Sequence, residues 1–84
     1  MDKKYTSGNT TITKGDFECL PLPLNTDGVT DEQMQEIADS VEREMKPWYD
    51  WRKDGLVTED EVADKRDELM ETFALAYMTY RDEE

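Results

Sequence analysis

The feature that most constrains the fold of this chain is a helix-start signal that occurs twice, in Thr30-Asp31-Glu32-Gln33 and in Thr58-Glu59-Asp60-Glu61. In each, a threonine is followed three residues later by a glutamine or glutamate, the pattern of a capping box. Acidic residues in the first turn also suit the positive end of the helix dipole. Asp54-Gly55 is a helix stop shortly before the second signal. This spacing predicts an antiparallel helical hairpin over residues 30–84.

Apolar residues recur at helical spacing in both segments. In the first they are Met34, Ile37, Ala38, Val41, Met45 and Trp48, and in the second Val62, Leu69, Phe73, Ala76 and Tyr80, joined by Met70 and Tyr77. Pro47 is expected to break or kink the first helix, unless it starts a new short turn. Lys65 and Arg66 occupy positions of the second helix that would face a core. We expect the aromatic side chains Trp48, Trp51, Phe73, Tyr77 and Tyr80 to fill that core, with a binding hot spot as the alternative.

Residues 1–29 are predicted to form an extended arm that carries a short β-hairpin. The β-branched segment Thr10–Thr13 favours a strand, Lys14-Gly15-Asp16 a turn, and Phe17–Leu20 a returning strand. Two strands alone are marginal in water, so the hairpin must pack on the helices. The Leu-Pro-Leu-Pro-Leu segment 20–24 is predicted to be an extended connector whose leucines lie across the helices.

Together these elements predict one small α+β domain over residues 1–84, a short N-terminal β-hairpin packed on an antiparallel two-helix hairpin. A purely helical protein with an irregular N-terminal arm is the alternative.

Composition excludes several classes of function. The chain has 22 acidic and 10 basic residues in 84, a net charge of −12. Because nucleic acids and anionic membranes attract basic surfaces, we expect direct binding to neither. Histidine, the commonest general base and zinc ligand, is absent, and no glycine-rich phosphate loop is present. The sequence therefore predicts neither an enzyme nor a cofactor.

The single cysteine, Cys19, has no second cysteine with which to form an intrachain disulfide. The first residues hold no apolar stretch of the secretory type, and no apolar run approaches the length of a membrane span. A reducing, cytoplasmic setting is therefore expected.

Acidic residues form a stripe along the second helix. Asp60, Asp64, Asp67 and Glu71 share one helical face, Glu68 lies beside them, and Glu36 and Asp39 of the first helix extend the negative surface. Residues 59–71 hold seven carboxylates over roughly 18 Å of helix. That is one per roughly 2.6 Å, between the phosphate spacings of duplex and single-stranded DNA.

Two interpretations of this stripe remain open. It is a solvated face of an acidic protein, or it occupies the basic surface of a partner that binds nucleic acid. The second makes the protein a small acidic inhibitor, such as a nucleic-acid mimic of the anti-restriction or anti-CRISPR type that phages and mobile elements use. That resemblance is one of size and charge.

The segment Asp50–Glu61 resembles a calcium-binding EF-hand loop. The resemblance implies Asp50 as the first ligand, Asp54 as the fifth-position ligand, Gly55 at the sharp turn and Glu61 as the bidentate ligand. Arg52 departs from the pattern, because it places a cation where the loop normally has Asp or Asn. A metal-free helix stop followed by a capping box accounts for the same residues. A third class of function is an assembly protein that binds through its aromatic face, including as a homodimer.

Overall fold

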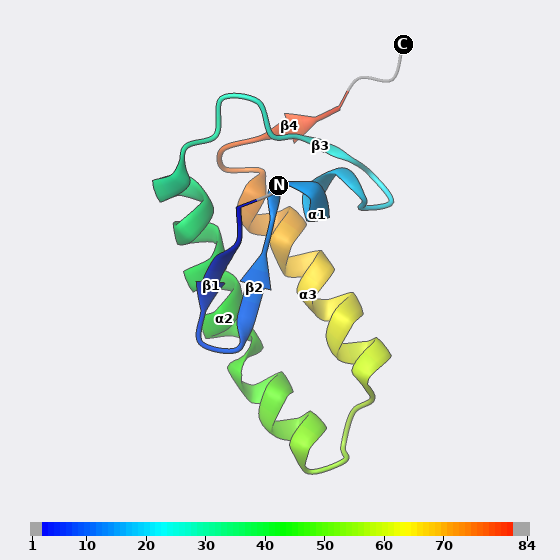
Figure 1. The fold of residues 1–84 in the computed structure, drawn as a ribbon. Coiled ribbons are helices and arrows are strands. Elements are labelled where there is room, and N and C mark those ends of the chain that lie inside the picture. Colours follow the sequence, from blue (N-terminus) through cyan, green and yellow to red (C-terminus); the bar gives the residue numbers. More distant parts are fainter. Residues whose placement is uncertain (1–2, 82–84) are drawn as a thin grey trace.

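Two long antiparallel helices, α2 (Asp31–Lys53) and α3 (Glu59–Ala74), form the frame on which the rest of the chain packs (Figure 1). The structure is a computed structural model that describes residues 3–81. Met1, Asp2 and residues 82–84, which the single-domain prediction included, lie outside the described residues. The remaining elements are β1 (Tyr5–Ser7), β2 (Thr10–Ile12), the short helix α1 (Lys14–Glu18), β3 (Leu24–Asn25) and β4 (Thr79–Tyr80).

Both long helices begin where the capping boxes predict. At the start of α2, the Gln33 amide donates to the Thr30 hydroxyl (3.1 Å) and the Thr30 amide donates to the Gln33 side chain (3.0 Å). Thr58 and Glu61 make the same reciprocal pair at the start of α3, at 3.2 and 3.1 Å. α2 ends at the predicted stop, with Asp54 as its C-cap. Its predicted apolar face is buried from Met34 to Met45.

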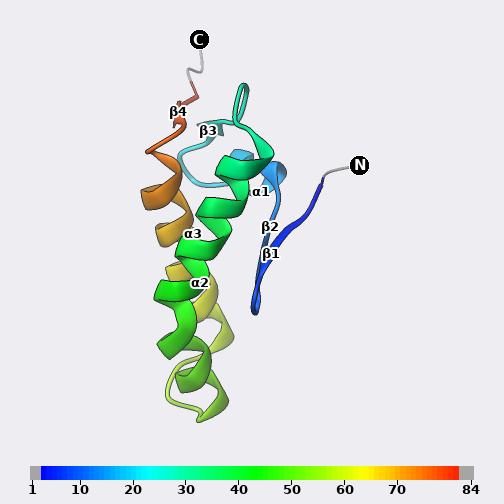
Figure 2. The ribbon, with the colours of Figure 1, turned by 90° about the vertical axis from the view of Figure 1, so that its left-hand side faces the viewer.

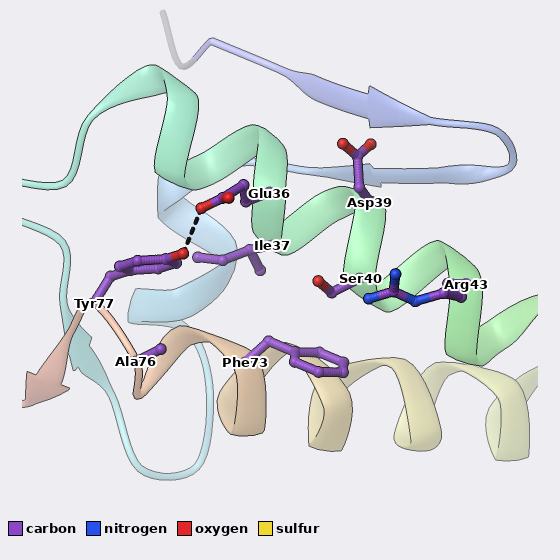
Figure 3. Close-up of a pocket in the computed structure, with 8 residues that line it drawn as sticks. All are labelled: Glu36, Ile37, Asp39, Ser40, Arg43, Phe73, Ala76 and Tyr77. Atoms are coloured by element: carbon purple, nitrogen blue, oxygen red, sulfur yellow. Dashed lines mark hydrogen bonds between the residues drawn. The ribbon is translucent and has the colours of Figure 1, made fainter.

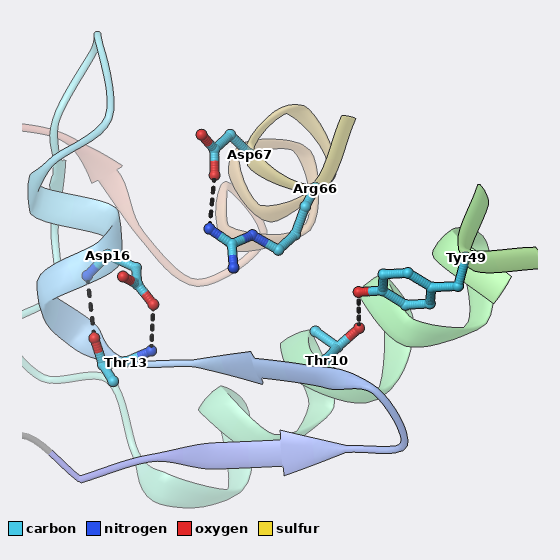
Figure 4. Close-up of polar contacts among 6 residues, drawn as sticks. All are labelled: Thr10, Thr13, Asp16, Tyr49, Arg66 and Asp67. Carbon is cyan, nitrogen blue, oxygen red and sulfur yellow. Dashed lines mark hydrogen bonds and ion pairs between the residues drawn. The ribbon is translucent and has the colours of Figure 1, made fainter. Parts of the chain in front are cut away.

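The N-terminal β-hairpin exists, but it lies earlier in the chain than predicted. β1 pairs antiparallel with β2, Tyr5 opposite Ile12 and Ser7 opposite Thr10, and the hairpin packs on α2 (Figure 2). The predicted turn at Lys14-Gly15-Asp16 and the returning strand at Phe17–Leu20 are wrong. Thr13 and Asp16 form a third capping box, with bonds of 3.3 and 2.9 Å, which starts α1 instead (Figure 4). The α+β class of the fold is confirmed.

The end of the chain also differs from the prediction. α3 stops at Ala74, and Tyr80, predicted to lie on this helix, belongs to β4, which pairs antiparallel with β3. This pairing holds the Leu-Pro-Leu-Pro-Leu connector beside the C-terminal segment. Leu20 and Leu24 are buried as predicted, whereas Leu22 is 58% exposed. The connector therefore anchors through two of its leucines.

The core is a single cluster of aliphatic side chains and methionines from both long helices and the N-terminal arm. Tyr5 and Phe17 are its buried aromatic members. The prediction of an aromatic core between the helices is wrong for Trp51, Tyr77 and Tyr80, which are exposed. The other two predicted core aromatics, Trp48 and Phe73, are partly buried and pack at its edge.

Pro47 lies inside α2 without ending it, so the predicted break is wrong. The helix continues because Met45 is buried before the proline and Trp48 packs against the core after it. Proline removes one helical amide donor, and apolar packing on both sides offsets that loss.

Candidate functional site

The predicted acidic face lies on the side of α3 that points away from the core. Val62, Met70 and Ala74 are the buried residues of this helix. Asp60, Asp64 and Glu68 are exposed, whereas Asp67 and Glu71 are half-buried. From Asp60 to Glu71 the carboxylates span roughly 16 Å of the helix axis. They form an open negative surface without an enclosed cavity.

Several of these carboxylates have intramolecular partners. Asp67 pairs with Arg66 at 3.4 Å (Figure 4), Glu68 pairs with Lys65 at 3.4 Å, and Glu71 accepts a hydrogen bond from the Tyr80 hydroxyl at 2.7 Å. Exposed pairs of this length contribute little to stability. Asp60 and Asp64 make no ion pair or side-chain hydrogen bond within residues 3–81. They carry the least compensated negative charge of the stripe.

Lys65 and Arg66 fill the core-facing positions of α3 predicted for them, and each lies against the body of the protein. The Lys65 ammonium lies 5.9 Å from the ring centroid of Trp48, a cation–π distance. The Arg66 Nε is buried and has no hydrogen-bond partner in the part of the chain that is described. Both cations therefore lie along the inner edge of the acidic face, where each is partly exposed and pairs with a carboxylate of α3.

Glu36 and Asp39, predicted to assist the acidic stripe, lie elsewhere. They belong to the rim of a cleft between α2 and the end of α3 (Figure 3). Glu36 accepts a hydrogen bond from the Tyr77 hydroxyl, and Asp39 accepts one from the side-chain amide of Gln35 at 3.2 Å. The structure thus separates the seven predicted contact residues into a helix face and a cleft.

The cleft has a volume of about 310 Å³ and an apolar floor of Ile37, Phe73 and Ala76. Ser40 and Arg43 of α2 complete its wall, and Tyr77 lies at one end (Figure 3). No residue of the β-hairpin lines it. Sequence periodicity did not single out this cleft, because its ends depend on where α3 stops and the chain turns back.

Two tyrosines donate hydrogen bonds to glutamates, and both bonds affect ionisation. The bond to Glu36 raises the pKa of Tyr77 above its ordinary value, and the bond to Glu71 does the same for the pKa of Tyr80. A tyrosine hydroxyl is already protonated at neutral pH, and the raised pKa values keep both hydroxyls as donors further into the alkaline range.

A third carboxylate cluster joins the N-terminal arm to α2. Asp31 accepts from the Lys3 ammonium at 2.8 Å and from the Tyr5 hydroxyl at 2.7 Å. These two bonds lower the pKa of the Asp31 carboxyl. The cluster fixes the arm on the start of α2.

In the described residues, the segment that resembles an EF-hand loop does not bring its predicted ligands together. α2 continues through Asp50 to Lys53, so the first four loop positions are helical. One Glu61 oxygen already accepts from the Thr58 amide and hydroxyl. Within residues 3–81, no group of three carboxylate, thiol or imidazole side chains is placed to hold a metal ion. The capping box accounts for Glu61, and Asp54 is the C-cap of α2.

Comparison of this chain with known proteins found no match among family models, curated proteins or solved structures.

Proposed function

We propose that this protein is a small acidic inhibitor that occupies the basic surface of a partner protein, one that binds nucleic acid. The observation that carries the proposal is the outer face of α3, where Asp60, Asp64 and Glu68 are exposed at one-turn intervals. In a chain of net charge −12, this face presents ordered carboxylates on a rigid helix. A basic cleft attracts such carboxylates as it attracts phosphates, because both are anions held at short, regular spacing.

The rigidity of the face supports the same proposal. α3 begins at a capping box and is held to α2 by buried Val62, Met70 and Ala74. A pre-ordered charge array loses less conformational entropy on binding than a flexible acidic tail. Inhibition would follow from occupation of the partner's nucleic-acid site, as for proteins of the anti-restriction or anti-CRISPR type.

The decisive experiment is affinity capture from a lysate of the source cell with three forms of the protein. The first is the wild type, and the second reverses the α3 face with Asp60→Lys, Asp64→Lys and Glu68→Lys. The third is a matched control on α2 that changes the net charge equally, with Glu32→Lys, Glu44→Lys and Asp50→Lys. All six positions are exposed.

The wild type and the control should capture a nucleic-acid-binding protein at low salt, and duplex DNA should displace it. The α3 variant should lose the capture while its helical circular dichroism is unchanged. Equal capture by the α3 variant and the wild type would refute the proposal, because the acidic face would then be ordinary solvated surface.

The setting that we propose is the cytoplasm, where nucleic-acid enzymes are encountered and a lone thiol stays reduced. Cys19 is exposed, and no helix within residues 3–81 is long and apolar enough to cross a membrane.

A second candidate is an assembly protein that binds through apolar surface. Leu22 and Tyr80, both exposed, line one cleft with Pro21 and Pro23. Binding through this surface should survive high salt, because apolar contacts are not screened as exposed charges are. Capture that persists at high salt and ignores DNA would favour this candidate.

A further inference from the structure

The cleft between α2 and α3 is a mixed surface, apolar at its floor and charged along its rim. Ile37 is 1% exposed, so it forms a fixed base, and the partly buried Phe73 ring lies beside it. Glu36 and Asp39 stand on the α2 rim, where Figure 3 shows the Glu36 carboxylate directed at Tyr77 and the Asp39 carboxylate directed away from α3. Arg43 lies along the same helix beyond Asp39, so two acidic groups and one basic group surround the cleft.

The rim carboxylates retain capacity to accept hydrogen bonds. An ionised carboxylate has about four acceptor positions. Glu36 uses one of them for the Tyr77 hydroxyl and Asp39 uses one for the Gln35 amide. The Tyr77 bond also holds the Glu36 side chain at the mouth of the cleft, so this acceptor is already oriented.

We propose that this cleft receives an arginine side chain, with an apolar neighbour, from a segment of the partner protein. The guanidinium donates to Glu36, and its plane stacks on the Tyr77 ring at the end of the cleft. The neighbouring apolar side chain covers Ile37 and Ala76. The inference rests on the proposed function, because it takes the partner to present a basic surface.

The chemistry of the cleft favours arginine over other occupants. A planar guanidinium combines several directed N–H donors with stacking on aromatic rings, whereas a lysine ammonium is a compact, strongly hydrated charge. The volume of about 310 Å³ is at the lower end of ligand pockets, which suits one long side chain and its neighbour. A second copy of this chain is disfavoured by charge, since each copy carries −12.

The inference is tested with short synthetic peptides in which one arginine and one leucine lie a helical turn apart on an alanine and glutamine background. One control peptide replaces the arginine with citrulline, its uncharged isostere, and another replaces the leucine with serine. Binding is followed by amide chemical shifts in two-dimensional NMR at low ionic strength. The arginine peptide should shift the amides of Ser40, Phe73 and Tyr77, and each control peptide should bind about tenfold more weakly.

Two variants of the protein and a matched control accompany the peptides. Ala76→Arg fills the cleft with a cation, whereas Ala63→Arg makes the same change at an exposed position of α3 outside it. Ala76→Arg should abolish the shifts and Ala63→Arg should preserve them. Glu36→Gln keeps an acceptor for the Tyr77 hydroxyl and should remove most of the preference for arginine over citrulline.

Three results of the peptide experiments would overturn the inference. They are no binding by the arginine peptide, equal binding by the citrulline peptide, and equal weakening by Ala76→Arg and Ala63→Arg, which would indicate non-directional charge attraction. A wild-type dimer that Ala76→Arg converts to a monomer would also overturn it, because a second copy would then occupy the cleft. If charge reversal on α3 abolishes lysate capture but no peptide binds, the cleft inference is wrong and the proposed function stands. Peptide binding in the cleft without capture of any basic partner would remove the proposed function.

Discussion

Gly8 lies in the turn between β1 and β2, where its replacement by alanine tests how the hairpin is held on α2. Its φ of +56° is in the left-handed region. A Cβ built at this position would lie 2.7 Å from the Glu42 carboxyl carbon and 2.8 Å from one carboxylate oxygen. The other oxygen of that carboxylate accepts the Asn9 amide at 2.9 Å and the Thr10 hydroxyl at 3.1 Å. Gly8→Ala therefore introduces backbone strain and also displaces the Glu42 carboxylate.

The two effects can be given magnitudes. Alanine in the left-handed region costs about 1–2 kcal/mol. Each hydrogen bond that is lost when the Glu42 carboxylate moves costs about 0.5–1.5 kcal/mol. With both bonds lost, we therefore expect Gly8→Ala to reduce the free energy of unfolding by roughly 2–5 kcal/mol, a large fraction of the stability of a small domain.

Gly55 provides a matched control. Its φ is +78°, and a Cβ built there meets no atom within 4 Å. Gly55→Ala should therefore cost only the strain, about 1–2 kcal/mol. In a Glu42→Ala background, Gly8→Ala should lower the free energy of unfolding by no more than Gly55→Ala does, because no carboxylate is left to displace.

The assay is urea unfolding followed by far-ultraviolet circular dichroism at constant salt, with the slope against urea compared between variants. If Gly8→Ala costs no more than Gly55→Ala, the Glu42 carboxylate does not hold the hairpin, and the reasoning is refuted.

Three further predictions concern the core and the ionisable clusters. Met45→Ala removes a fully buried side chain and should lower the free energy of unfolding by about 2–5 kcal/mol in the same urea assay. Because the pKa of Asp31 is lowered in the folded protein, its contribution to stability is present above the pKa of the unfolded carboxyl and is lost as pH falls through the folded value. Asp31→Asn should accordingly flatten the acid side of the stability profile, and an unchanged profile would contradict the assignment. The pKa values of Tyr77 and Tyr80 are raised in the folded protein. The contribution of these tyrosines to the free energy of unfolding is therefore complete below the pKa of an unfolded tyrosine, and it is lost as pH rises through the folded values. Tyr77→Phe and Tyr80→Phe should each remove a late-titrating component from the ultraviolet titration. If either substitution removed a component with the ordinary tyrosine pKa instead, the corresponding glutamate bond would be absent.

The helix starts were predictable because a capping box is local information. Thr30 and Thr58 each carry their partner side chain three residues ahead, so no distant contact is needed to define the helix start. Thr13 and Asp16 carry the same information. In that segment the β-branched threonines favour a strand and Gly15 favours a turn, so the sequence predicts a turn where a helix begins.

The chain beyond Ala74 was less predictable, because its structure depends on a distant segment. Tyr77 and Tyr80 continue the helical spacing of α3, yet β4 forms by pairing with β3 from the other end of the sequence. Helical periodicity alone does not report such a pairing. The same limit applies to the candidate site. Helical spacing could place the carboxylates of α3 on one face, but the cleft at Glu36 could not be predicted without knowing where Tyr77 lies.

Pro47 has a consequence for how the long helix α2 opens. A proline has no amide to donate to the carbonyl four residues earlier, so the ladder of backbone bonds in α2 lacks one link. The β-hairpin reaches only part of the way along α2 (Figure 1), and after Pro47 the hydroxyls of Thr10 and Tyr49 still join the two, at 2.7 Å. The missing link thus divides the part of α2 beside the hairpin from the last turns of the helix. Amide hydrogen exchange in the native state should reveal this division as faster exchange after Pro47 than before it.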